Sequence, residues 1–166
     1  MRVSNRLLIV VGVASLAASP ALGQRADNQL SPQSVAMFQQ GQQLLSAGKF
    51  DEAEDALEAA LVADPRNRGA FVSLARVAQK QSLYGKSIRL ANKALALEPN
   101  DLDALEVQGE AMVELGATAR AQVNLAKLQK LCGNSCKQVA MLTSVISKGP
   151  TVASATPPKT PATKSN

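Results

Sequence analysis

Thirty-four residues separate Pro65 from Pro99, and the residues that lead into the two prolines are nearly the same. Positions 60–67 read ALVADPRN, and positions 94–101 read ALALEPND. A motif that returns after such a period is typical of helix-turn-helix arrays, in which each unit buries its apolar face against the next unit. The spacing therefore predicts an all-α chain folded as an α-solenoid. Arrays of this kind present extended surfaces that bind other molecules.

The composition favours closely packed helices and argues against several classes of activity. Apolar residues make up 46% of the 166 residues but aromatic residues only 2%, so the core must consist of Ala, Leu and Val. The chain contains no His, which removes imidazole acid–base chemistry and the commonest metal ligand. We therefore expect no cofactor, no metal site and no catalytic residue.

The net charge of +5 does not indicate a nucleic-acid-binding protein. Four of the basic residues lie in the two terminal segments, which leaves +1 for the part that is expected to fold; these four are Arg2, Arg6, Lys159 and Lys164. The sequence also lacks a cluster of Lys and Arg interleaved with aromatic residues, which is the electrostatic footprint of nucleic-acid binding.

Residues 1–23 have the pattern of a secretory signal peptide. Arg2 and Arg6 make the start positive, a short apolar run follows, and small residues precede a cleavage site after Gly23. A transmembrane anchor is the alternative, but the run is shorter than the roughly 20 apolar residues that span a bilayer. We expect an exported protein, with retention of the signal segment as the alternative to its removal.

Residues 149–166 form the second terminal extension and consist mainly of Thr, Pro, Ala, Lys and Ser. Such a segment has almost no apolar surface to bury, which predicts a disordered tail. A role as a peptide ligand or spacer is the alternative to a plain solvated tail.

Between the two extensions, apolar residues recur at helical spacing in three successive pairs of segments. The pairs share positions that are typical of the tetratricopeptide repeat family, which residues 34–135 resemble. These positions hold a small residue in the first helix (Gly41, Ala75, Gly109), an aromatic residue opening the second (Phe50, Tyr84), a small residue soon after it (Ala53, Ser87, Ala121), a later alanine (Ala60, Ala94) and a terminal proline (Pro65, Pro99). The resemblance implies a right-handed α-solenoid.

The third pair departs from the family pattern, because Thr118, Leu128 and Gly133 stand where an aromatic residue, an alanine and a proline are expected. Terminal repeats commonly depart in this way, since one face of them meets solvent. We expect a further helix to cap the array. The predicted division is a signal peptide (1–23), a linker (24–33), two repeats (34–67 and 68–101), a degenerate third repeat (102–135), a capping helix (136–148) and the tail (149–166).

Cys132 and Cys136 flank a short turn before the expected capping helix. In an exported chain an even pair of cysteines is best explained by a disulfide, which would fix the angle of the capping helix. A redox-active pair and a zinc site are the alternatives, although thiol oxidoreductases space their cysteines two apart and two cysteines without His make a poor zinc site. The turn is similar to a Cys-Gly-x-x-Cys turn in some small exported bacterial repeat proteins. This similarity implies a structural disulfide and the periplasm of a Gram-negative bacterium.

In the tetratricopeptide family the first helix of each pair lines a concave groove, and the resemblance implies such a groove here. Its expected residues are Phe38, Gln42, Leu45, Val72, Arg76, Gln79, Lys80, Asp103, Glu106, Glu110 and Glu114. The last three are four residues apart, which places their carboxylates on one helix face. The groove should therefore change from apolar, through basic, to acidic.

Two interpretations of these charges remain open. In the first, Arg76 and Lys80 face the glutamates of the next repeat as loose surface ion pairs, worth about 0–1 kcal/mol each. In the second, the graded groove orients an extended or helical peptide. One binding mode of the family is not expected, because a clamp for C-terminal carboxylates needs Lys and Asn at positions that here hold Phe38, Gln42, Ser73, Asp103 and Val107.

The sequence thus predicts a non-catalytic adaptor or scaffold of the bacterial cell envelope. Its partner would be a segment of another protein, held in the concave groove, and neither nucleic acid nor a membrane span of the mature chain is expected. A thiol–disulfide redox protein using Cys132 and Cys136 is one alternative. An architectural subunit of a larger envelope assembly is the other.

Overall fold

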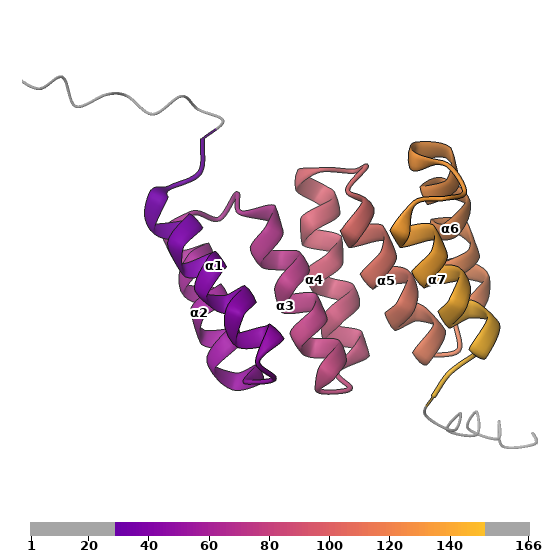
Figure 1. The fold of residues 1–166 in the computed structure, drawn as a ribbon, viewed down its shortest axis with the longest axis horizontal. Coiled ribbons are helices and arrows are strands. Elements are labelled where there is room, and N and C mark those ends of the chain that lie inside the picture. Colours follow the sequence, from indigo (N-terminus) through magenta and orange to yellow (C-terminus); the bar gives the residue numbers. More distant parts are fainter. Residues whose placement is uncertain (1–28, 152–166) are drawn as a thin grey trace, which may run out of the picture.

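The computed structural model describes residues 29–151, and within this range the chain forms seven helices and no strand (Figure 1). The helices are α1 Pro32–Ser46, α2 Phe50–Ala63, α3 Arg68–Lys80, α4 Tyr84–Leu97, α5 Leu102–Glu114, α6 Thr118–Cys132 and α7 Lys137–Lys148. The first six pack as three successive pairs, and α7 follows at the C-terminal end. The predicted all-α solenoid is confirmed.

Several sequence predictions fall on residues outside this range. The signal peptide 1–23, most of the linker 24–33 and nearly all of the tail 149–166 lie outside the described residues. The division of the chain into segments and the export of the protein stay predictions.

The 34-residue period reappears in the way the first helices begin. Asn67 and Asp101 stand 34 positions apart and are the N-cap residues of α3 and α5. Each side chain accepts a hydrogen bond from a backbone N–H three residues later, at 3.1 Å from Ala70 N and at 2.6 Å from Ala104 N. Both caps are buried. Because the first N–H groups of a helix have no partner within it, these two side chains determine where the equivalent helices start.

The turns inside the three pairs also share one conformation. Gly48, Ser82 and Gly116 follow one another at the repeat period, and all three have positive φ (76°, 60° and 75°). Glycine adopts this left-handed conformation without a Cβ clash. Ser82 adopts it in the middle pair, where the backbone path of the repeat demands it despite the side chain.

Two glycines permit the closest helix contacts. A Cβ at Gly41 of α1 would lie 2.5 Å from Cγ of Leu57 on α2, and a Cβ at Gly109 of α5 would lie 2.7 Å from Cδ2 of Leu142 on α7. Both leucines are fully buried. The missing side chains therefore allow α2 and α7 to pack onto their neighbours at van der Waals distance.

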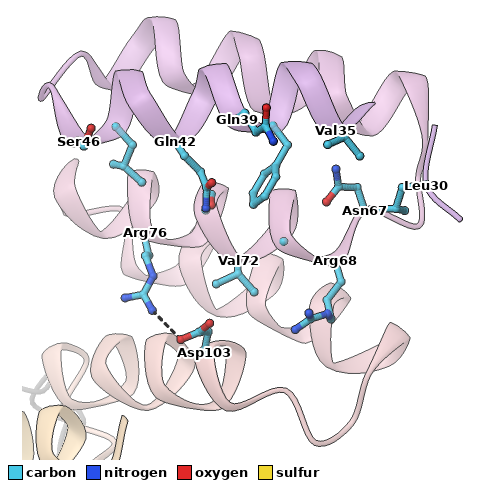
Figure 2. Close-up of a pocket in the computed structure, with 14 residues that line it drawn as sticks. Leu30, Val35, Gln39, Gln42, Ser46, Asn67, Arg68, Val72, Arg76 and Asp103 are labelled. Carbon is cyan, nitrogen blue, oxygen red and sulfur yellow. Dashed lines mark ion pairs between the residues drawn. The ribbon is translucent and has the colours of Figure 1, made fainter. Parts of the chain in front are cut away.

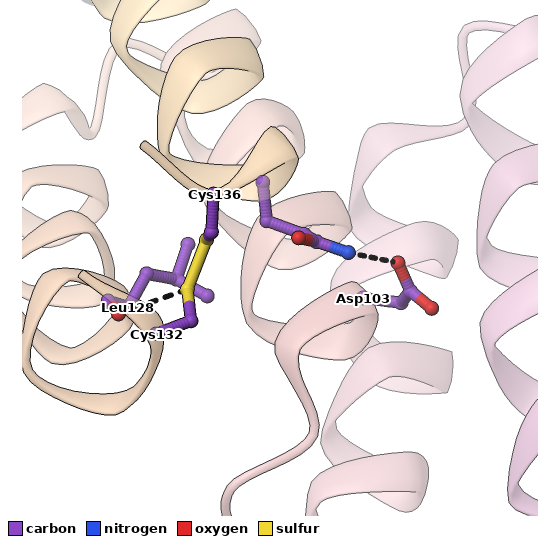
Figure 3. The surroundings of a disulfide bond; sticks show 5 residues. Asp103, Leu128, Cys132 and Cys136 are labelled. Carbon is purple, nitrogen blue, oxygen red and sulfur yellow. Dashed lines mark hydrogen bonds between the residues drawn. A yellow bond between two sulfur atoms is a disulfide. The ribbon is translucent and has the colours of Figure 1, made fainter. Parts of the chain in front are cut away.

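Helix α7 takes the place that the first helix of another repeat would have. It packs on both α5 and α6, just as α5 packs on both α3 and α4. A disulfide joins Cys132 at the end of α6 to Cys136 before α7, with an S–S distance of 2.05 Å (Figure 3). Buried Val139 and Leu142 attach α7 to the core. As a result, the last helix extends the face formed by α1, α3 and α5.

Candidate functional site: a divided groove on the first helices

A groove of about 620 Å³ runs between α1, α3 and the start of α5 (Figure 2). Six of the predicted groove residues line it: Phe38, Gln42, Leu45, Val72, Arg76 and Asp103. Arg68 and Gly69, which are not among the residues predicted from the sequence, also line it. Arg68 stands four residues before Val72, so the helical period of α3 would have identified it.

Phe38 forms the apolar wall of this groove. Its ring lies on the backbone of α3 at Gly69, where a Cβ would be only 2.8 Å from the ring atom Cζ. Val35 and Leu45 continue the wall along α1. Because Gly69 has no side chain, the ring closes the gap between α1 and α3, and the wall can receive an apolar side chain of a bound segment.

Arg76 lies at the centre of the groove and is paired with two carboxylates of α5. Its Nη2 atom is 2.6 Å from Oε2 of Glu106 and 3.5 Å from Oδ1 of Asp103, the second contact being visible in Figure 2. The side chain of Glu106 is 1% exposed and that of Arg76 is 30% exposed. Burial alone lowers the pKa of Arg76, but the hydrogen bond and charge of Glu106 raise it overall, so the guanidinium is charged.

This pairing corrects the predicted arrangement of the charges. Glu106 was expected to be open to the groove, but it is fully buried because Arg76, on the neighbouring helix, draws its carboxylate inward. In the first of the two interpretations of these charges, Arg76 and Lys80 face Glu110 and Glu114 as loose surface ion pairs. Arg76 pairs instead with Asp103 and Glu106, so the pair with Glu106 is a buried structural contact.

Polar side chains also join α5 to α3 and to α7. The side-chain amide of Gln79 donates to the carbonyl oxygen of Val107 at 2.9 Å and to Oε2 of Glu110 at 3.4 Å. On the α7 side, Gln138 donates to Oδ1 of Asp103 at 3.0 Å, the hydrogen bond drawn beside the disulfide in Figure 3. A second cavity, of about 210 Å³, lies at the C-terminal ends of α3 and α5.

The second cavity contains the remaining predicted groove residues, which are Gln79, Lys80, Glu110 and Glu114. Tyr84 and Val145 also line it. Burial and the charge of the nearby Glu106 raise the pKa of Glu110 to about 7. Val145 belongs to α7, for which the sequence predicts only a capping role. A helix that follows a degenerate repeat carries no sequence signal for the groove.

Between residues 29 and 151, His, Cys, Asp and Glu form no group of three or more suited to a metal ion. Both cysteines are joined in the disulfide. In the same part of the chain, every helix is too short or too polar to cross a membrane.

Comparison with known proteins shows which fold this is. No family model and no curated protein matches the sequence. The first TPR domain of Spaghetti (RPAP3), bound to an HSP90 peptide, matches with a TM-score of 0.66 and 21% identity, over 72% of this chain and 98% of that one. The TPR2B domain of yeast Sti1, in its pHsp70 complex, matches with a TM-score of 0.63 and 18% identity, over 71% and 98%.

A bacterial structure matches equally well. The type III secretion chaperone SycD of Yersinia enterocolitica, in complex with a peptide of the translocator YopD, has a TM-score of 0.62 and 18% identity, over 71% of this chain and 95% of that one. All three matches include nearly the whole of the other domain, and identity at this level shows a shared fold. The chain therefore has the fold of tetratricopeptide-repeat domains.

Proposed function

We propose that this chain is a non-catalytic protein-interaction module that binds a segment of another protein in the groove formed by its first helices. The observation that carries the proposal is the groove of about 620 Å³, with the ring of Phe38 as its apolar wall and a row of polar groups on α3 and α5 opposite. Concave sites with apolar walls and a few placed polar groups are the common form of binding sites.

The structural neighbours support this proposal. The three matched domains are described as bound to an HSP90 peptide, to pHsp70 and to a peptide of YopD. The present groove is built for a different ligand from a C-terminal carboxylate. Phe38 and Gln42 stand where a carboxylate clamp needs Lys and Asn, and the guanidinium of Arg76 is already paired with Glu106. An internal segment of a partner protein fits the groove better.

The proposed place of action is the periplasm of a Gram-negative bacterium. The support comes from the sequence, namely the signal-like residues 1–23 and a pair of cysteines in a short turn. The disulfide between Cys132 and Cys136 agrees with an oxidising compartment. The N-terminal mass of the mature protein, measured by intact-mass spectrometry, tests this part: a chain that retains Met1 contradicts removal of the signal segment.

Site-specific photo-crosslinking in the native envelope tests the binding proposal. A photoreactive residue replaces Gln42, which is exposed and lines the groove, and in a matched control it replaces Val62, which is 86% exposed on α2 and lies outside the groove. We expect one or a few defined adducts from position 42 and none of these from position 62. The same adducts from both positions, or none from position 42, contradict a groove-bound partner.

The same experiment separates the alternatives. An architectural subunit would give adducts from the ends of the array, for example from α6, and none from position 42. A redox protein would form mixed disulfides with its partner through Cys132 or Cys136, and a reducing agent would cleave them.

A further inference from the structure

The C-terminal end of the groove is a second binding surface of different character. Its cavity of about 210 Å³ adjoins another of about 380 Å³, and Glu110 and Val145 line both. The second of these cavities is otherwise lined by Ala140, Met141 and Ser144 of α7. This end therefore combines a carboxylate on α5 with an apolar strip on α7.

In the described part of the chain, the carboxylates at this end are not held in ion pairs, although Lys80 lines the same cavity as Glu110 and Glu114. Asp101, Asp103 and Glu106 each pair with an arginine of α3. Over residues 29–151, no ion pair within 4.0 Å involves Glu110 or Glu114. The amide of Gln79 reaches Glu110 only at 3.4 Å. The negative charge at this end is thus compensated only at longer range, by Arg76 among others, which is unfavourable for a group that is partly removed from water.

We infer that this end of the groove binds a partner segment that carries a Lys or Arg side chain next to an apolar residue. The cation would lie between Glu110 and Glu114, and the apolar residue would lie on Met141 and Val145. The inference rests on the proposed function, since it names the chemistry of the segment that the groove takes. Charge complementarity favours this partner, because a cation would relieve the repulsion among the glutamates of α5.

One contact in the structure already shows Glu114 in use as an acceptor. Its Oε2 atom accepts hydrogen bonds from the backbone N–H of Thr151 at 2.9 Å and from the Thr151 hydroxyl at 2.8 Å. A chain segment that arrives from outside the helix pairs therefore reaches this carboxylate. The chain itself continues to Lys159 and Lys164, so its own C-terminal residues are the competing occupant that the experiment must distinguish.

The binding should depend on pH, because a cation binds the ionised carboxyl. The charged and titratable groups at Glu110 are Arg76 and Lys80 of α3, Tyr84 of α4, and Glu106 and Glu114 of α5. The residues of α7 that line the two cavities carry no charge. Because burial and Glu106 raise the pKa of Glu110 to about 7, a basic segment should bind more tightly at pH 8 than at pH 6.

Fluorescence anisotropy with the full chain tests the inference. The probes are three labelled model peptides that share one Leu and differ only in having Lys, Gln or Glu beside it. At pH 8 we expect the Lys peptide to bind about tenfold more tightly than the Glu peptide, with the Gln peptide between them. Moving to pH 6 should weaken only the Lys peptide. Equal affinity for all three peptides, or no binding of the Lys peptide, overturns the inference.

Two sets of variants show which residues cause the preference for the Lys peptide. Glu110→Gln with Glu114→Gln should weaken the Lys peptide about tenfold and leave the Gln peptide unchanged, whereas Asp55→Asn, an exposed carboxylate on α2, should change neither. If Lys159→Gln with Lys164→Gln is required before any peptide binds, the occupant is the chain's own tail and the assignment to a partner is wrong. If adducts from position 42 persist while the glutamate variants bind the Lys peptide normally, the proposed function stands and this inference fails.

Discussion

Removal of the Arg76 charge is the sharpest test of how the groove is held together. In Arg76→Met the length and packing of the side chain are largely kept, but Glu106, whose side chain is 1% exposed, loses a guanidinium at 2.6 Å. Breaking a buried ion pair by removing one partner costs about 3–5 kcal/mol, and we expect about 3 kcal/mol because Arg76 is itself 30% exposed. This corresponds to a fall in Tm of roughly 10 °C for a domain of this size.

Urea unfolding followed by circular dichroism at pH 7 measures this loss, and Lys86→Met is the matched control. Lys86 pairs with Glu54 between α4 and α2, but both side chains are partly exposed (33% and 22%), so this pair should contribute less than about 1 kcal/mol. The double variant Arg76→Met with Glu106→Leu should recover most of the loss.

If Arg76→Met and Lys86→Met lower the free energy of unfolding by the same amount, the pair of Arg76 with Glu106 is a loose surface contact, which contradicts the expected loss.

Four further outcomes are expected. Ser82→Gly should raise the free energy of unfolding by about 0.5–1 kcal/mol in urea titrations, because Ser82 has φ 60° where the other two pairs have glycine; a loss of stability would contradict this. Gly109→Ala should lower the free energy of unfolding by about 1–3 kcal/mol and speed proteolysis of α7, because the new Cβ would lie 2.7 Å from Leu142. In the control Gly85→Ala, the nearest atom is Arg89 Nη1 at 3.7 Å, so stability should be unchanged or higher. Replacing Cys132 and Cys136 by Ser should lower the free energy of unfolding by about 2 kcal/mol, which is the loop entropy of so short a disulfide ring. Hydrogen exchange should rise first in α7. An unchanged urea midpoint would argue against this. Because the pKa of Glu110 is raised to about 7, the folded state holds this proton more tightly than the unfolded chain does. The free energy of unfolding should therefore fall by on the order of 1–2 kcal/mol between pH 5 and pH 8, a figure that is discounted for the partial exposure of the side chain. Glu110→Gln should flatten this dependence on pH.

The fold could be predicted from the sequence because its determinants repeat. The period that relates Pro65 to Pro99 also relates the N-caps Asn67 and Asp101 and the turn residues Gly48, Ser82 and Gly116. Each of these acts within one turn of its own helix, through a cap, a left-handed φ or a missing Cβ. Local effects of this kind can be identified from residue type and spacing.

The candidate site could be predicted only in outline. Ten of the eleven predicted residues line one of two cavities, of about 620 and 210 Å³, because they lie on the inward face of first helices. Glu106 does not, and the contribution of Val145 and Met141 was missed. The first error came from a partner 30 residues away, and the second from the way α7 continues the row of first helices.

The sequence by itself therefore determined the kind of molecule: helix pairs of a fixed length, stacked into a solenoid with a groove along one face. Only the tertiary structure decided which charges in that groove are open. Glu106 and Glu110 are four positions apart on one helix face, yet the first is buried in an ion pair with Arg76, while the second has no ion pair among the described residues and its pKa is raised to about 7. Residue type and helical spacing are the same for both, and burial and the nearest opposite charge depend on how neighbouring helices pack.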